Sequence, residues 1–282
     1  MHRIVFLCFL AAHNFAAGAP VPIEVGDGTV DGRLIGNYRH DWHQCTVQDD
    51  KWVEAGIVTE ETVIDDNRLL HKQTTARADG IKSVATTVFD HVSLAPLSMT
   101  LKVTGPDGQT LAAANRELDS RGYRGTVQRG DKEPQTVSGT ISSTMFHGAV
   151  LGLPLATLDY SNDSYEFDAS MMSFDAQYRV IARFAGKKEM KLHGRTVMLH
   201  LVDVEWHHDN GDVYPPGPDA SGGRYWLLAE PAEGIPIVLR YKTDSYAVEF
   251  LPVTCAVTVE SRERSTVHRA SRPHRYSFCR VC

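Results

Sequence analysis

The chain has 282 residues, a formal net charge of −6 and 42% hydrophobic residues, which suffices for one large domain with a full core or two small ones. Residues 256–282 contain six Arg and two Glu, a balance of +4, and Arg3 is the only charged residue among residues 1–19. The net charge of −6 therefore leaves about −11 for residues 20–255. This acidic body argues against nucleic acid and against an anionic membrane surface as partners, because both are bound through clustered Lys and Arg.

The first residues have the pattern of a secretory signal. Arg3 is followed by a mostly apolar, uncharged run over residues 4–12 and by small residues at 16–19. We predict a signal peptide over residues 1–18, because Pro20 disfavours a cut directly after residue 19. A first β-strand is the alternative. The apolar run is shorter than the roughly 20 residues that span a bilayer, so we expect an exported or extracellular protein, with no transmembrane segment after cleavage.

Apolar and β-branched residues recur with a period near two along most of the remaining chain, which predicts half-buried strands. The dipeptides Asp79-Gly80 and Asp107-Gly108 favour the positive φ angles of tight hairpins, so successive strands should pair antiparallel. No alternation of strand, helix and strand is present, which argues against a doubly wound sheet. The expected strands are residues 53–64, 81–89, 97–103, 122–128, 135–141, 177–185, 190–206, 224–228, 235–242 and 246–253.

Residues 143–158 break this period, because they are apolar, contain glycine and are interrupted by Pro154. They predict a short helix near residues 144–151, with Pro154 ending it or starting the next turn; a buried pair of strands is the alternative. Polar and Pro-rich stretches at residues 160–173 and 207–223 predict loops.

Together these patterns predict a mainly β fold, in which a curved antiparallel sheet (a half-barrel or open barrel) packs on one short helix. We expect a single β domain over residues 19–255. Residues 256–282 have no apolar period, and we expect them to form a basic, disordered tail.

Four cysteines remain after removal of the signal, and exported proteins live where thiols oxidise. Cys45 lies early in the predicted domain and Cys255 lies at its end. A disulfide between them would close a very long loop, for which chain entropy predicts several kcal/mol of stabilisation. Two free thiols are the alternative.

Several segments follow one another in the order of a known family: residues 88–90 with 94–98, 151–155, 194–205, 225–227 and 235–240. In this order they resemble exported bacterial proteins of unknown function with the curved sheet of lipoprotein carriers (LolA-like). The resemblance covers roughly residues 36–252. It implies a periplasmic or envelope protein and a ligand in the concavity of the sheet, and it implies no catalytic residue. The His- and Pro-rich loop after Trp206 and the basic tail depart from the family pattern.

Aromatic side chains beside the Pro-rich loop suggest a binding site, because aromatics line apolar pockets at the mouths of curved sheets. Our first hypothesis is therefore non-catalytic binding of a lipid-like or other apolar or amphipathic envelope molecule. It predicts a sizeable apolar cavity near Phe146, Leu151, Trp206 and Trp226, with Tyr225 beside it. Ordinary core packing of these side chains is the alternative.

The second hypothesis is a metal-dependent hydrolase that uses His207, His208 and Asp209, since imidazole and carboxylate are good zinc ligands. Adjacent residues of a strand point to opposite faces, so these side chains could share an ion only if the strand has ended. A polar strand end in solvent is the alternative. No serine elbow and no phosphate-binding loop occurs, so we expect no cofactor and lean away from an enzyme. A structural envelope protein is the third hypothesis, and the sequence does not set the oligomeric state.

Overall fold

The computed structural model describes residues 19–49, 51–119, 121–140, 145–170, 177–192, 194–208, 223–231, 235–243 and 246–250. The predicted signal peptide and basic tail lie outside these residues. Strands dominate the described chain, together with one α-helix and two short 3-10 helices. The elements in chain order are β1 (Val21–Pro22), η1 (Gly32–Leu34), β2 (Tyr38–Gln48), β3 (Lys51–Asp65), β4 (Arg68–Arg77), β5 (Lys82–Asp90), β6 (Pro96–Thr104), β7 (Thr110–Asp119), β8 (Gly122–Arg129), β9 (Gln135–Thr140), β10 (Phe146–His147), η2 (Gly148–Val150), α1 (Gly152–Ala156), β11 (Ser164–Ser170), β12 (Gln177–Leu192), β13 (Arg195–His208), β14 (Gly223–Leu228), β15 (Val238–Lys242) and β16 (Tyr246–Phe250).

All strands belong to one sheet, in the order β1-β11-β12-β13-β14-β15-β16-β2-β3-β4-β5-β6-β7-β8-β9, with β10 paired to β11. Only β1 and β10 run parallel to their neighbour β11, and every other pair is antiparallel. Among the described strands, β1 and β9 end this path without pairing to each other, so the sheet curves without closing. The predicted open, mainly antiparallel fold is therefore confirmed.

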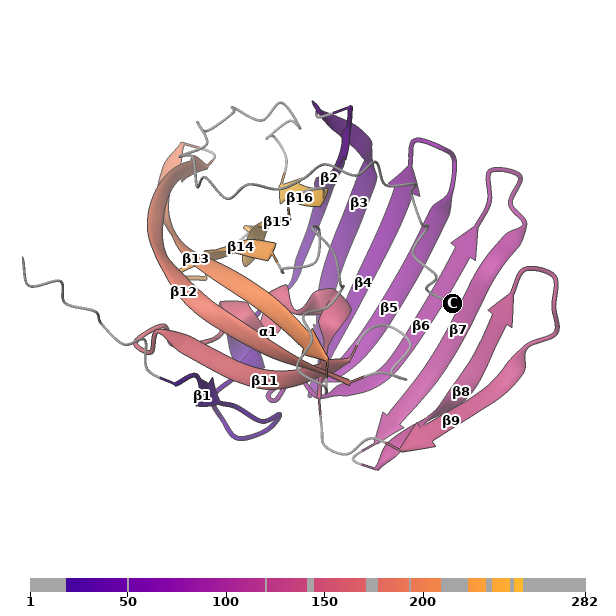
Figure 1. Cartoon of the computed structure of the whole chain (residues 1–282), viewed down its shortest axis with the longest axis horizontal. Helices are drawn as coiled ribbons and strands as arrows, with labels where there is room; N and C mark the ends of the chain where they lie inside the picture. The colour runs from indigo at the N-terminus through magenta and orange to yellow at the C-terminus, as the bar shows by residue number, and fades with distance from the viewer. Residues whose placement is uncertain are drawn as a thin grey trace, which may run out of the picture.

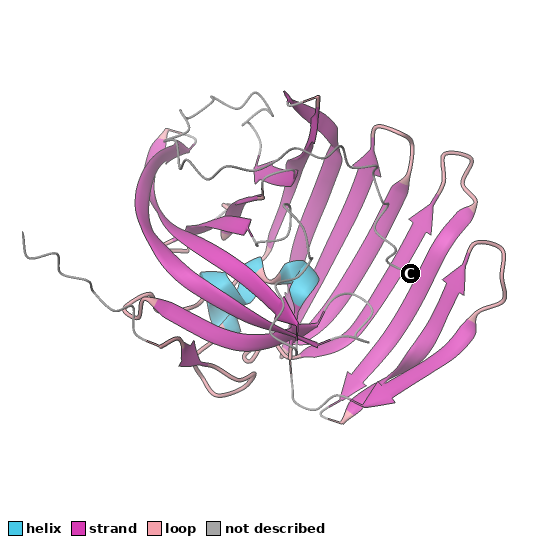
Figure 2. Cartoon of the chain, viewed as in Figure 1, coloured by secondary structure: helices cyan, strands magenta, loops and turns pink. Residues whose placement is uncertain are grey.

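Figure 1 shows how the sheet curves around α1: β2–β9 form a broad wall, and β12 and β13 bend round on the opposite side. The helix lies in the hollow between them, as Figure 2 also shows. Leu153 and Leu155 of α1 are 2% and 0% exposed, so the helix stays in place through burial of apolar surface. Gly152 allows close packing, because a Cβ there would lie 2.6 Å from Val238 of β15.

Two large apolar clusters and a small one around Cys45 and Ala247 form the core. The larger one surrounds α1 and includes Leu69 of β4 and Phe89 of β5, which face each other across the two strands. The smaller of the two large clusters joins Trp42 of β2 to Leu199 of β13 and Leu228 of β14. The curved sheet thus packs partly against itself and partly against the helix.

The helix lies farther along the chain than the sequence predicted. Phe146 and His147 are extended, and the α-helix begins at Gly152 rather than near residue 144. Pro154 lies in its first turn, where the backbone N–H has no helical acceptor and the fixed φ of proline suits the helix. We expected Pro154 either to end a helix or to start the next turn, and the second expectation is confirmed.

Most expected strands are present with shifted ends, and the turns at Gly80 and Gly108 have the positive φ angles that the hairpins require. The expected break over residues 186–189 was wrong, because β12 continues through a bulge at Gly186 and turns only near Gly194. The expected loop over residues 160–173 was wrong in part, because residues 164–170 form β11. Strands β2, β4 and β7 were not foreseen, since polar residues on their buried face hide the period of two.

Within the described part of the chain, none of the helices has the length and apolar character required to cross a bilayer.

Candidate functional site

A row of polar side chains crosses the buried face of the sheet from β2 to β5. Cross-strand partners point to the same face, and the register places Tyr38 opposite Thr62, Thr62 opposite His71, and His71 opposite Thr87. The last three of these residues are 1% to 2% exposed. We call the face that carries this row, together with Leu69 and Phe89, the inner face.

Between this row and the next lies a hydrogen-bonded group of three side chains, Tyr38, Glu60 and His71, which we call the polar cluster. The Nε2 atom of His71 lies 2.6 Å from Oε1 of Glu60, and the hydroxyl of Tyr38 donates to the same oxygen at 2.8 Å. The side chain of His71 is 3% exposed and that of Glu60 is 14% exposed. Two donors therefore converge on one carboxylate at the border of the larger apolar cluster.

The electrostatics of the cluster favour an ionised carboxylate. Burial alone would raise the pKa of Glu60, but the charge and hydrogen bond of His71 and the hydrogen bond of Tyr38 hold it below its ordinary value. Burial, followed by the nearby charge of Glu60, raises the pKa of Tyr38 well above its ordinary value. Because an ionised carboxylate only accepts hydrogen bonds, His71 must donate its Nε2–H.

A second buried imidazole faces the polar cluster from the segment before α1. His147 of β10 is 2% exposed, and burial, followed by the charge of His71, lowers its pKa to about 3. At neutral pH it is therefore uncharged. The inner face thus holds a fixed negative group and a neutral imidazole beside the core, which could orient the polar end of a bound molecule.

Beyond the polar cluster, the inner face becomes apolar toward the free edge of the sheet. One row runs from Ala85 through Leu101 and Ala114 to Val127, and a parallel row contains Val103 opposite Ala112. Met99 lies in the row of His71. We call this surface on β5–β8 the open face, defined by Ala85, Met99, Leu101, Val103, Ala112, Ala114 and Val127.

The described helices and strands leave this surface largely uncovered. The most extensive contacts of α1 with strands are with β14 and β15, and β7–β9 have extensive contacts only with their neighbours in the sheet (Figure 1). Met99 and Ala112 are buried, whereas Leu101 and Val127 are half-buried. The opposite face of the same strands carries exposed Thr100 and Thr126, so these strands are amphipathic. Their apolar side is nevertheless not covered by any described element of the core.

Buried Arg116 marks one border of the open face. It is 4% exposed, and its Nη1 donates to the backbone oxygens of Asn115 at 3.0 Å and Thr126 at 2.9 Å. Its guanidinium also lies 5.5 Å from the centre of the Tyr123 ring. Gly125, opposite Arg116, leaves space for this arrangement, since a Cβ there would overlap the carbonyl of Asn115.

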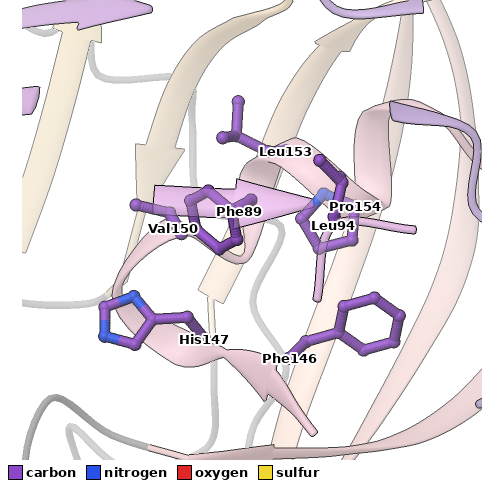
Figure 3. A pocket seen from close by; sticks show the side chains of 7 residues that line it. All are labelled: Phe89, Leu94, Phe146, His147, Val150, Leu153 and Pro154. Atoms are coloured by element: carbon purple, nitrogen blue, oxygen red, sulfur yellow. The ribbon is translucent and has the colours of Figure 1, made fainter. Parts of the chain in front are cut away.

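The predicted binding residues do not surround one cavity in the described part of the chain. Phe146 and Leu151 lie in the larger cluster, and Phe146 meets the ring of Phe167 edge-on. Figure 3 shows the space beside Phe146, which is bounded by β10, η2, α1 and the end of β5 and has no room for a water molecule. This space is far smaller than the sizeable cavity expected near Phe146.

The remaining aromatics divide between the two clusters. Trp206 packs on the larger cluster, edge-on to Tyr178, whereas Trp226 packs on the smaller one beneath the guanidinium of Arg240. Tyr225, the residue before Trp226, stacks on Tyr241 with ring centres 4.5 Å apart. These side chains serve the core, and their role as ligand residues stays a prediction.

The predicted metal ligands are only partly described. The imidazole of His207 lies 3.4 Å from a carboxylate oxygen of Glu205, and His208 continues the strand as the partner of Tyr178. Asp209 lies outside the described residues. No group of three His, Cys, Asp or Glu side chains in the described ranges is placed to hold a metal ion, and the metal site stays a prediction.

Sequence reasoning missed the polar cluster. Its members come from three strands, and only the register brings them together. One signal was present, because Glu60 and His71 are ionisable residues that lie two positions from the apolar residues Val58 and Leu69, on the same face of their strands.

Comparison with known proteins supports the fold. Neither a family model nor a curated protein matches the sequence. Among solved structures, a β-barrel-like protein of Brucella abortus, described as a domain of unknown function (DUF1849), is similar with a TM-score of 0.51. The match covers 79% of this chain and 97% of that chain at 8% sequence identity, and at this identity it concerns the fold alone.

Proposed function

We propose that this protein is a non-catalytic binding protein of the bacterial envelope that holds an apolar or amphipathic molecule on the open face. The observation that carries the proposal is the continuation of the apolar inner face beyond the core. Leu101, Ala114 and Val127 lie side by side on three strands, with no described helix over them. Apolar surface of this kind on an exported protein typically marks a binding site.

The dimensions of the open face suit an acyl chain or a similar slender apolar group. Four strands at their usual spacing of about 4.8 Å give a width of about 14 Å. The face is apolar from β6 to β8 and polar on β3 and β4, where Glu60 and Gln73 lie in the same row as Leu101. An amphipathic ligand would therefore direct its polar group toward the polar cluster.

An envelope location is part of the proposal. It rests on the signal-like residues 1–18 and on the LolA-like order of segments, and the fold of the Brucella protein is compatible with it. Resemblance of folds is an associational argument, so the ligand must be tested on the site itself.

We also propose a disulfide between Cys45 and Cys255. Cys45 is 1% exposed, and Cys255 follows the end of β16 by five residues. Strand β16 pairs with β2, and Ala247 lies opposite Cys45. The bond would fix the last described strand onto β2 and hold the curved sheet together.

The experiment that tests the binding function is native mass spectrometry of the full chain, secreted with its own signal into a bacterial periplasm and purified without detergent. The expected result is a fraction of molecules with an added mass that matches an extracted lipid or other amphiphile. The Leu101→Glu variant, prepared identically, should lack this adduct. A wild-type protein free of any adduct that also fails to take up added fatty acid would contradict the proposal.

A further inference from the structure

A second hollow lies on the opposite face of the sheet, near the turn that joins β7 to β8. Cross-strand pairs place Val88, Ser98, Glu117 and Arg124 in one row of that face, which points away from the polar cluster. We call the hollow the outer groove. Its volume is about 540 Å³, within the range of small-molecule sites. Its lining includes Arg68, Val88, Leu97, Glu117, Arg121 and Arg124.

The charged side chains of the outer groove are unequally engaged. Glu117 is paired with Arg124 at 3.0 Å, and Oδ1 of Asp119 accepts the backbone N–H groups of Arg121 and Gly122. Within the part of the chain that the structure describes, no ion pair engages the guanidinium of Arg68 or of Arg121. Three guanidinium groups thus face two carboxylates, and both carboxylates already have partners.

The rest of the lining is apolar or bare backbone. Val88 and Leu97 present aliphatic groups. Tyr123 and Gly139 border the groove from inner positions of β8 and β9, and the Tyr123 ring itself lies beside Arg116 on the inner face.

We infer that the outer groove binds a small anionic molecule that joins a carboxylate or phosphate group to an apolar or aromatic body. Arg68 and Arg121 would hold the anionic group, since guanidinium matches the geometry of both anions with paired hydrogen bonds. The body would lie against Val88 and Leu97. This site is separate from the open face, and its residues play no part in the binding proposed there.

The test is an amide NMR titration of the full mature chain with phenyl phosphate, benzoate and neutral benzyl alcohol. We expect saturable shifts of the Gly122 and Gly139 amides with one or both anions and none with the alcohol; the stronger anion identifies the group. Arg68→Ala and Arg121→Ala should each weaken binding by about tenfold or more, the loss of one charge-assisted hydrogen bond or two.

The matched control is Arg39→Ala, which removes an exposed arginine from the same face of β2, outside the groove. It should bind like the wild type. Absence of saturable shifts, equal binding of benzyl alcohol, or an equal loss in the Arg39→Ala variant would each overturn the inference. Leu101→Glu changes the open face and leaves the outer groove unchanged. The failure of the anion-site inference and the failure of the open-face proposal can therefore be distinguished.

Discussion

His71 and Glu60, on neighbouring strands of the inner face, are joined by a 2.6 Å contact between Nε2 and Oε1 at the edge of the apolar core. A carboxylate in such a place is stable only when donors surround it, and Tyr38 supplies the second one. The pair therefore fixes the register of β3 and β4 and gives the inner face its only described negative group beside the core.

Removing the carboxylate should destabilise the fold. Glu60→Ala leaves the buried donors of His71 and Tyr38 without their acceptor, which typically costs about 3 kcal/mol. Glu61→Ala is the matched control, since Glu61 is the next residue of the same strand and points to the outer face. Urea unfolding at pH 7 measures both. A loss of stability in the control equal to that in Glu60→Ala would refute the role of the cluster.

Stability should fall in acid through His147. Its pKa is about 3 in the folded chain and near 6.5 when unfolded, so only the unfolded chain takes up the proton between these values. The free energy of unfolding should then fall by up to about 1.4 kcal/mol per pH unit below pH 6.5. The lowered pKa of Glu60 acts in the same direction, because its stabilisation is present above its unfolded pKa and lost as pH falls through the folded one.

The check is the pH dependence of urea unfolding between pH 7 and pH 5. His147→Asn should show a flatter profile than the wild type over this range, whatever its absolute stability. Identical slopes in the two proteins would mean that His147 titrates normally in the folded state.

The disulfide proposal predicts a cross-linked peptide and a loss of stability on reduction. A non-reducing digest should yield one peptide pair that contains Cys45 and Cys255. Cys45→Ser should lower the free energy of unfolding by about 2–5 kcal/mol, as for other native disulfides. A digest in which Cys45 is linked to Cys279 or Cys282 would rule out the pairing with Cys255.

The pairing of β7 and β8 should depend on Gly125. Gly125→Ala forces a Cβ against the carbonyl of Asn115, so the strands must separate and Arg116 must lose its bond to Thr126. We expect a loss of about 1–3 kcal/mol, the usual cost of overpacking. Gly36→Ala adds a Cβ that meets no atom within 4 Å, and its effect should be small. Thermal unfolding of the two variants compares them directly.

The alternation of residues and the Asp-Gly turns were sufficient to predict an open antiparallel sheet, because each depends only on nearby residues. Strands β4 and β7 escaped prediction because His71 and Arg116 occupy inward positions where apolar residues were expected. The helix was displaced because the apolar run before Gly152 extends into β10 and η2.

The candidate site was harder to predict, because it depends on strand register. Trp206 and Trp226 looked like pocket residues in the sequence, but the register of β13 and β14 places them on opposite faces of the sheet, in separate clusters. In the sequence, Leu101, Ala114 and Val127 look like ordinary strand residues. Only the strand register shows that they lie side by side, and only the fold shows that the helix packs elsewhere.

The most direct test of the binding function uses pairs of variants on the two faces of one strand. Leu101→Glu and Val127→Glu place a charge on the open face, whereas Thr100→Glu and Thr126→Glu place it one residue away on the outer face. Fluorescence titration of each purified protein with cis-parinaric acid measures binding of an amphipathic chain. We predict saturable binding by the wild type and both outer-face variants, and a loss of at least about tenfold in both open-face variants. Equal affinity in all five proteins, or no saturable binding by the wild type, would contradict the proposed function.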